Sequence, residues 1–132
     1  MGLWQGRSRR KPTGGRLRPF RKKRRFEIAR EFQFATIGGG YVKKYRVRGA
    51  NRKLRVMTVS AINVYDPATK KMQVAKVLTV RENKANPNYV QRNIITRGAV
   101  VETDLGLVEV RSRPGQDGVL NGIRLAKAAT PA

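Results

Sequence analysis

Residues 54–65 read Leu-Arg-Val-Met-Thr-Val-Ser-Ala-Ile-Asn-Val-Tyr and are rich in β-branched and aromatic side chains. Such side chains favour β-strands because they pack well on a pleated, half-buried surface. Asp66-Pro67-Ala68-Thr69 follows with the residues of a turn, in which proline pre-sets φ. The stretch therefore predicts one long strand that ends in a turn.

Further strands flank this stretch on both sides. Residues 45–48 alternate apolar and basic side chains, as expected of a strand with one solvated face, and residues 49–52 form a turn. After the turn at residues 66–69, polar segments with Gly or Pro divide the remaining candidate strands, which cover residues 72–80, 94–95 with 99–102, 107–110 and 119–125. This pattern predicts a mainly β fold, either a small antiparallel barrel or a sandwich.

Residues 1–26 differ in composition from the rest of the chain. They carry 11 Lys or Arg and no Asp or Glu, and their apolar residues show no helical or strand period. Pro12 and Pro19 interrupt helix, and Gly14-Gly15 adds backbone freedom. We therefore expect a long, basic, largely irregular N-terminal extension that is disordered in water and orders when phosphates neutralise it. A short helix is possible near residues 22–31.

These differences predict three parts of the chain. A basic arm that ends in a glycine hinge covers residues 1–40, a β-domain covers residues 41–125, and a tail covers residues 126–132. Gly38-Gly39-Gly40 lacks the Gly-Lys-Ser/Thr ending of a P-loop, so a hinge is favoured over a phosphate-binding loop.

The overall charge narrows the choice of partner. The 132 residues include 30 Lys or Arg and 8 Asp or Glu, and the formal charge of +22 favours a polyanion, either nucleic acid or an anionic membrane. No stretch of about 18 apolar residues exists to span a bilayer. The apolar segment of a signal peptide is also missing after the start. We therefore expect nucleic acid as the partner, with no membrane and no small-molecule substrate.

The sequence contains no cysteine and no histidine. This excludes disulfides, Cys or His zinc sites, thiol nucleophiles and imidazole acid–base catalysis. Glu102 and Asp104 would share one face of a strand, where they could hold Mg²⁺ or form an acid–base pair. Without any recognisable nucleophile motif the set is incomplete. We interpret both as surface acids and expect no enzyme, no catalytic residue, no metal and no cofactor.

Candidate RNA contacts come from the basic segments. Arginine holds phosphate oxygens with two parallel hydrogen bonds, and glycine lets backbone N–H groups approach the same oxygens. Alternatives are a solvated charge run or a cellular address label for the arm, a generic basic surface for residues 45–55, and a structural turn for residues 112–118. The candidate RNA-binding residues are Arg7, Arg9, Arg10, Lys11, Thr13, Gly14, Gly15, Arg16, Arg18, Arg21, Lys22, Lys23, Arg24 and Arg25 in the arm, then Arg48, Arg52, Lys53 and Arg113.

Two phenylalanines, Phe20 and Phe26, lie within the arm's second basic run. Aromatic side chains stack on exposed bases in single-stranded RNA. More often, such residues anchor an arm to its own domain. The sequence leaves both interpretations open.

Several segments resemble the archaeal and eukaryotic small-subunit ribosomal proteins of the S8e family, in their short archaeal form. Each segment alone is a weak signal, but their order and spacing together are specific. They are Arg9-Arg10-Lys11-Pro12-Thr13-Gly14-Gly15, Lys22-Lys23-Arg24 with Glu27 and Arg30, Thr36-Ile37-Gly38, Val47-Arg48-Gly49-Ala50-Asn51-Arg52-Lys53, Arg97-Gly98-Ala99 with Glu102-Thr103, and Ser112-Arg113-Pro114-Gly115-Gln116-Asp117-Gly118.

The resemblance implies a β-barrel body and a basic extension threaded into ribosomal RNA. It also implies residence in the small ribosomal subunit of the cytoplasm, among neighbouring ribosomal proteins, in a structural role without catalysis. The chain departs from the family pattern at Ala50, where a second glycine usually follows Gly49, and a turn that needs φ > 0 would tolerate glycine better. The large insertion of eukaryotic members is missing, which points to an archaeal source. The rival interpretations are a DNA-compacting, chromatin-type protein and a free RNA chaperone of ribosome assembly.

Overall fold

The computed structural model describes residues 3–125 and divides the chain into two compact units, Met1–Phe32 and Gln33–Ala132. Each unit is described by itself below. The predicted tail, residues 126–132, lies outside the described residues. Within residues 3–125, none of the helices has the length and apolar character that a membrane span requires.

The first unit contains little regular structure. Two isolated antiparallel bridges, Trp4–Ile28 and Arg10–Arg16, hold its segments together. In place of the helix considered near residues 22–31 there is a single 3-10 turn, η1 (Arg25–Glu27). The helix does not continue because Ile28 has extended backbone angles (φ −115°, ψ 126°) and pairs with Trp4.

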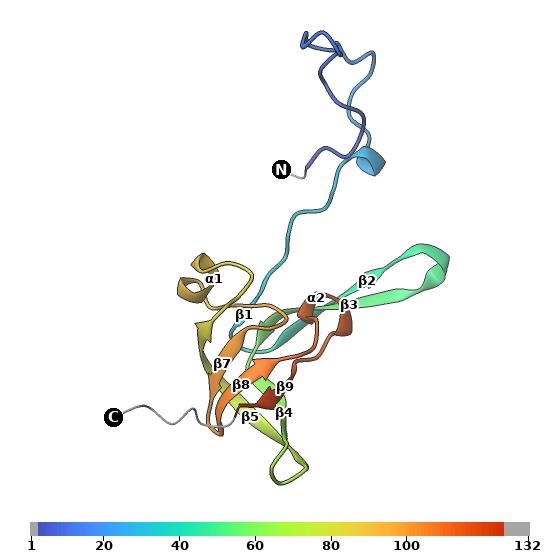
Figure 1. Cartoon of the computed structure of the whole chain (residues 1–132). Coiled ribbons are helices and arrows are strands. Elements are labelled where there is room, and N and C mark those ends of the chain that lie inside the picture. The colour runs from blue at the N-terminus through green and yellow to red at the C-terminus, as the bar shows by residue number, and fades with distance from the viewer. Residues whose placement is uncertain (1–2, 126–132) are drawn as a thin grey trace. The chain divides into compact units, whose positions relative to one another are not determined.

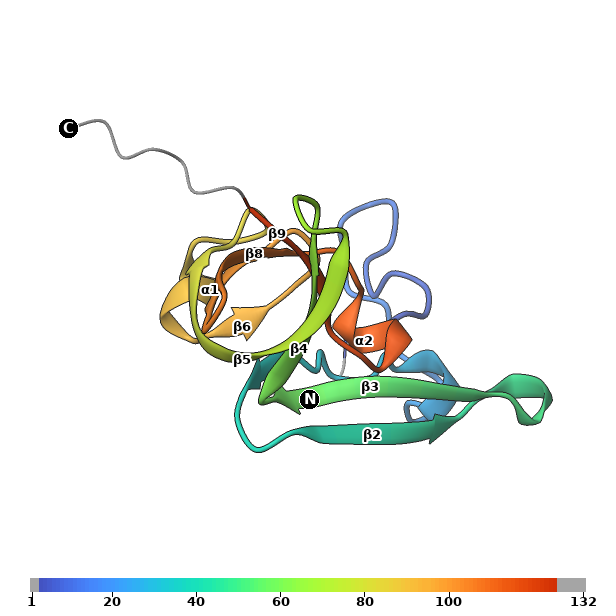
Figure 2. The same ribbon diagram turned by 90° about the horizontal axis from the view of Figure 1, so that it is seen from below.

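The second unit is mainly β and contains a closed barrel, as predicted (Figures 1 and 2). The barrel has the strand order β4-β5-β7-β8-β9, with bounds Ala61–Asp66, Lys71–Glu82, Val100–Thr103, Gly106–Val110 and Asn121–Arg124. Its neighbouring strands are antiparallel except β4 and β9, which close the barrel as a parallel pair. Asn63 donates to Asn121 across this closure at 2.9 Å.

A four-stranded sheet lies beside the barrel, in the order β2-β3-β1-β6. Its strands are β1 (Ala35–Ile37), β2 (Tyr41–Arg46), β3 (Arg52–Val59) and β6 (Ile94–Ile95). Gly38-Gly39-Gly40 connects β1 to β2. Three short helical turns complete the described part of this unit: η2 (Arg48–Ala50), α1 (Asn88–Gln91) and α2 (Pro114–Asp117).

The single strand predicted over residues 54–65 is two strands in two different sheets. The chain leaves β3 at Val59 and starts β4 at Ala61, so Ser60 is the crossing point. Burial follows the same division, because Val59 of β3 and Ile62 of β4 are buried three residues apart whereas one strand face repeats every two. The composition of the stretch is uniformly β, which hides this change of face.

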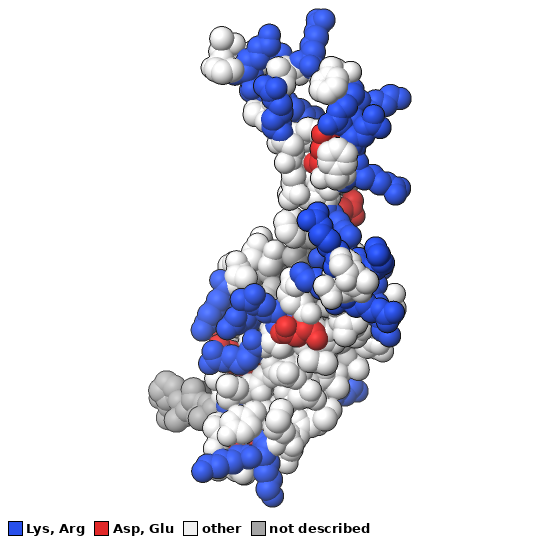
Figure 3. All heavy atoms as spheres, turned by 90° about the vertical axis from the view of Figure 1, so that its right-hand side faces the viewer, with Lys and Arg blue, Asp and Glu red and all other residues white. Residues whose placement is uncertain are grey.

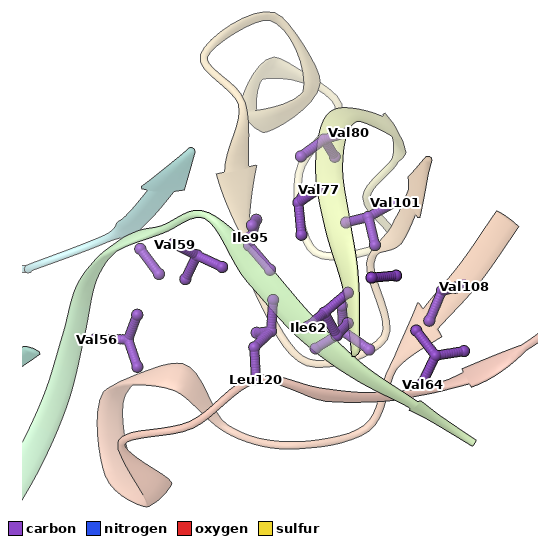
Figure 4. Packing of buried hydrophobic residues seen from close by; sticks show 13 residues of the cluster. Val56, Val59, Ile62, Val64, Val77, Val80, Ile95, Val101, Val108 and Leu120 are labelled. Carbon is purple, nitrogen blue, oxygen red and sulfur yellow. The ribbon is translucent and has the colours of Figure 1, made fainter. Parts of the chain in front are cut away.

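One hydrophobic core joins the sheet to the barrel. Val56 and Val59 of the sheet belong to the same cluster of buried side chains as Ile62, Val64 and Val108 of the barrel (Figure 4). Valine and isoleucine make up most of this interior, as suits a small barrel with short radial distances. The cluster fixes the base of the β2–β3 hairpin, because Val56 is part of β3.

Gly122 of β9 has no room for a side chain. A Cβ there would lie 2.4 Å from Val108 Cγ1 and 2.8 Å from the Glu109 carbonyl oxygen, and the backbone oxygen cannot rotate away. We predict that Gly122→Ala lowers the free energy of unfolding by about 1–3 kcal/mol, through overpacking. Urea denaturation of the full chain measures the change.

Gly39→Ala is the matched control, since a Cβ at Gly39 meets nothing within 4 Å. It should leave the unfolding midpoint unchanged. Equal midpoints for the two variants would mean that β9 is not packed against β8 as described.

Candidate nucleic-acid interface

The candidate RNA-binding residues fall into two groups, one in each unit. Those between Arg7 and Arg25 belong to the first unit, and Arg48, Arg52, Lys53 and Arg113 belong to the second. All are exposed except Arg21, which is partly buried. In Figure 3 many of the atoms of the first unit that face the viewer are those of Lys and Arg.

A small hairpin organises residues 9–17. The Gly14 N–H donates to the Lys11 carbonyl at 2.9 Å, closing a turn with Pro12 in its second position and Gly14 in the left-handed region at φ 83°. Leu17 N–H donates to the Arg9 carbonyl at 2.7 Å, and the Arg10 guanidinium donates to the Gly14 carbonyl at 2.8 Å. The predicted glycine and proline therefore shape a turn in this arm.

The two ends of the first unit lie side by side. Gln5 N–H donates to the Glu27 carbonyl at 2.8 Å, and Ala29 N–H donates to the Leu3 carbonyl at 2.7 Å. Trp4 between them donates its indole N–H to the Arg7 carbonyl at 2.8 Å, and the Arg9 guanidinium carbon lies 5.2 Å from its ring centroid. Gly6 permits this arrangement, because a Cβ there would lie 2.5 Å from the Trp4 ring.

Glu27 is the acidic residue around which η1 forms. Its carboxylate accepts hydrogen bonds from the Arg24 backbone N–H at 3.1 Å and from the Arg21 guanidinium at 2.5 and 3.2 Å. The Arg24 N–H, and then Arg21, hold the pKa of this carboxyl below its usual value. Among the candidate cations in the described chain, Arg21 is the one neutralised by an ion pair.

The second group centres on the hairpin of β2 and β3, which extends well past the barrel in Figures 1 and 2. Arg48 lies in η2 at its tip, and Arg52 and Lys53 begin β3. Gly49 and Ala50 both have left-handed backbones, with φ of 70° and 60°. Ala50, where the family pattern usually has glycine, therefore occupies a position with φ > 0. This backbone conformation is strained for any residue with a Cβ.

Both hairpins place positive charges directly opposite one another. Lys43 faces Arg55 and Arg46 faces Arg52 across β2 and β3, and Arg10 faces Arg16 in the first unit. Side chains in directly opposed positions have Cβ atoms about 5 Å apart, and like charges there destabilise the pair. A phosphate between two such cations would turn the repulsion into two attractions.

Tyr45 reduces the repulsion on one face of the hairpin. The Lys43 ammonium lies 5.4 Å and the Arg55 guanidinium carbon 5.1 Å from the centroid of its ring, and both cations are attracted to the ring face. The Tyr45 hydroxyl also donates to the Gln33 side-chain oxygen, which fixes the ring. No comparable aromatic lies between Arg46 and Arg52 in the described structure.

Arg113 is the N-cap residue of α2, which packs against β3. A Cβ on Gly118, the residue after α2, would lie 2.5 Å from Leu54 Cβ, so helix and strand approach closely there. The Asp117 carboxylate accepts a hydrogen bond from the Arg113 backbone N–H at 2.7 Å. The Arg113 guanidinium takes no part in this bond, and it is exposed to another molecule. Residues 112–118 therefore form a structural turn that presents an exposed cation, and the RNA contact through Arg113 stays a prediction.

The barrel, in contrast, neutralises several of its own cations. Arg81 pairs with Glu102 at 2.8 Å, Arg111 with Glu109 at 3.2 Å, and Arg124 with Asp66 at 3.0 Å. The Ala68 N–H, and then Arg124, lower the pKa of Asp66. Glu102, once considered beside Asp104 as a catalytic acid, is held by Arg81 on the surface.

The structure adds four hairpin cations to the sequence-based set. Lys43, Lys44, Arg46 and Arg55 flank the predicted Arg52 and Lys53 on the same two strands. The sequence shows them as basic residues in or near an alternating strand. Their cross-strand pairing depends on the register, which composition does not reveal.

Comparison with known proteins gives a consistent result. A sequence model of the family described as Ribosomal protein S8e matches residues 4–125. The small ribosomal subunit protein eS8 of Methanobrevibacter smithii is 54% identical over 123 residues, which make up 93% of this chain and 98% of the relative. Proteins of the same name from Picrophilus torridus and Methanocorpusculum labreanum are 46% and 50% identical, over 95% and 92% of this chain and 100% and 97% of the relatives.

The opposed pair Arg46–Arg52 gives a test of the charge argument. We predict that Arg52→Glu stabilises the free protein by about 0.2–1 kcal/mol, because a like-charge pair becomes an opposite-charge pair. The same substitution should weaken RNA binding. Urea denaturation and RNA titration of one preparation measure both effects, with Lys84→Glu, at an exposed position outside the paired strands of the second unit, as the control of equal charge change. A loss of stability in Arg52→Glu would contradict the pairing.

Proposed function

The chain belongs to the ribosomal protein S8e family, and on this premise we propose that it is a structural constituent of the small ribosomal subunit. In this role it binds and stabilises folded ribosomal RNA through the basic first unit and the β2–β3 hairpin. Its partners are small-subunit ribosomal RNA and neighbouring ribosomal proteins, within cytoplasmic ribosomes. Family membership implies a structural role, and we propose that the chain has no catalytic activity.

The observation that carries this proposal is the presence of exposed, opposed cations on two hairpins. Arg10 and Arg16, and likewise Arg46 and Arg52, lie opposite each other with no carboxylate paired to them in the described structure. Without a polyanionic partner, the repulsion between these cations would lower the stability of the folded protein and serve no function. RNA phosphates provide that partner.

The mechanism is electrostatic. Folding of a large RNA brings phosphates close together, and their repulsion opposes compaction. The cations of the first unit and of the hairpin can lie between RNA segments and offset that repulsion, releasing the counterions that had done so. The turn at Lys11–Gly14 and the hairpin based in the core hold these cations at defined positions.

Phosphate contacts carry no sequence information, so the choice of site must come from RNA shape. The β2–β3 hairpin is suited to this task, because its base is part of the hydrophobic core and its cations follow a fixed register. The glycines of the first unit let the backbone come close to phosphates as well. We propose Thr13, Gly14 and Gly15 as contacts of this kind, beside the arginines and lysines.

Neutralising three arm cations gives the first test. Each lost phosphate contact lowers the slope of log affinity against log salt by about 0.7–0.9, so Lys11→Gln, Arg16→Gln and Arg25→Gln together should lower it by roughly 2–3. Titration of purified small-subunit ribosomal RNA between about 50 and 200 mM salt measures the slope. Lys71→Gln, Lys76→Gln and Lys84→Gln, on exposed positions of the second unit, remove the same charge and should change the slope little. Equal slopes in both triple variants would contradict the proposal that the cations of the first unit bind phosphates more than other exposed cations do.

Association with the ribosome gives the second test. Sedimentation of native lysate through a density gradient should place the chain with the small subunit and retain it through a moderate-salt wash. A chain that stays at the top of the gradient would favour the free chaperone. One that follows the DNA would favour the compaction rival.

A further inference from the structure

The first unit contains a cavity of about 720 Å³ that phosphate binding alone does not explain. Residues Trp4, Leu17, Pro19 and Phe20 form apolar parts of its lining. Its volume lies within the range of about 300–1,000 Å³ that is usual for small-molecule sites. A surface that only neutralises phosphates needs cations and no such hollow.

Phe20 is the exposed aromatic group of this cavity. Its side chain is 93% exposed, although it lies in a unit whose Trp4 is partly buried. The Arg21 guanidinium carbon lies 5.4 Å from the centroid of the Phe20 ring, so the ring lies beside a guanidinium that Glu27 holds in place. An exposed aromatic ring next to a cation is an unused platform for stacking.

Trp4 forms a wall of the cavity that is held in place. Its indole N–H is bound to the Arg7 carbonyl, and its ring lies against Gly6 and beneath the Arg9 guanidinium. Because three neighbours fix the ring, the wall is preformed and little ordering is needed when a ligand enters.

Cations surround this apolar lining. Arg7, Arg18, Lys22 and Lys23 also line the cavity, and the one carboxylate among the lining residues, Glu27, is already bound by Arg21 and by the Arg24 N–H. An occupant must therefore combine a flat apolar group with several negative charges. A nucleotide has both, in its base and its phosphates.

We propose that this cavity takes up an unstacked nucleobase of ribosomal RNA, which stacks on Phe20 while the adjacent phosphates bind the surrounding cations. This inference rests on the proposed function and adds to it a stacking contact with a base, which does not depend on the base's identity. It assigns Phe20 to stacking and leaves Phe26 outside, since Phe26 does not line the cavity.

Trp4 makes the test direct, because it is the single tryptophan of the chain. The probes are two single-stranded RNA oligomers of the same length, one ordinary and one with abasic nucleotides in its central part. They carry the same phosphate charge. The ordinary oligomer should change the Trp4 fluorescence of the full chain and bind about 5- to 150-fold more tightly than the abasic one, as expected for one stacked base.

Two matched variants then separate stacking from charge. Phe20→Ala should abolish the preference for the ordinary oligomer and leave the salt slope unchanged. Phe26→Ala should keep the preference, although Phe26 is 80% exposed and also lies beside Arg21, with 5.8 Å between its ring centroid and the guanidinium carbon.

The outcomes distinguish this inference from the function on which it rests. Equal affinity and equal fluorescence change with both oligomers would overturn the base-binding cavity and leave the phosphate-binding function intact. The loss of preference in both phenylalanine variants would also overturn it, because the cavity would not be what selects the base. If neither oligomer nor purified ribosomal RNA bound at all, the proposed function itself would fail.

Discussion

Repulsion between like charges is the constraint on which the rest of this structure depends. Arg10 faces Arg16, Lys43 faces Arg55 and Arg46 faces Arg52, in a chain of formal charge +22. Each pair needs something else to keep its strands together. In the first unit this is the Lys11–Gly14 turn with its bond from the Arg10 side chain, and in the second it is the core below the hairpin and Tyr45 between two cations. These local contacts thus hold opposed cations in place, and a polyanionic partner would neutralise them.

The barrel, in contrast, neutralises several of its own cations, and its packed core gives the hairpin a stable base. Partly buried acids of the barrel pair with its own arginines, as in Arg81–Glu102 and Arg124–Asp66, and its interior consists mostly of packed valine and isoleucine. Because these pairs balance charge internally, the proposed RNA contacts lie on the other elements. The chain therefore separates a part that folds by burying apolar surface from parts whose charges the proposed RNA contacts would neutralise.

Composition and alternation were enough to predict a mainly β fold with a barrel among the alternatives, and the basic segments identified exposed cations. They were not enough where structure depends on distant pairing. Residues 54–65 look like one strand because nothing in their composition marks Ser60 as the passage between two sheets. The arm was expected to lack internal order in water, yet the bridge between Trp4 and Ile28 joins segments far apart in sequence. The cross-strand cation pairs depend likewise on register, and the four-residue helices α1 and α2 are too short for a periodic signal.

The parallel pairing of β4 with β9 has a consequence for the order of events during synthesis. Asn63 and Asn121, bonded across that closure, are 58 residues apart, so the barrel cannot close until most of the chain has been made. Contacts between residues far apart in sequence form slowly, because the chain must lose the entropy of loop closure before they can form. The internal bonds of the first unit, in contrast, all lie within the first 32 residues. A nascent chain would thus present its cationic segment, with its local bonds formed, to RNA before its body has folded, and capture could precede completion of the fold.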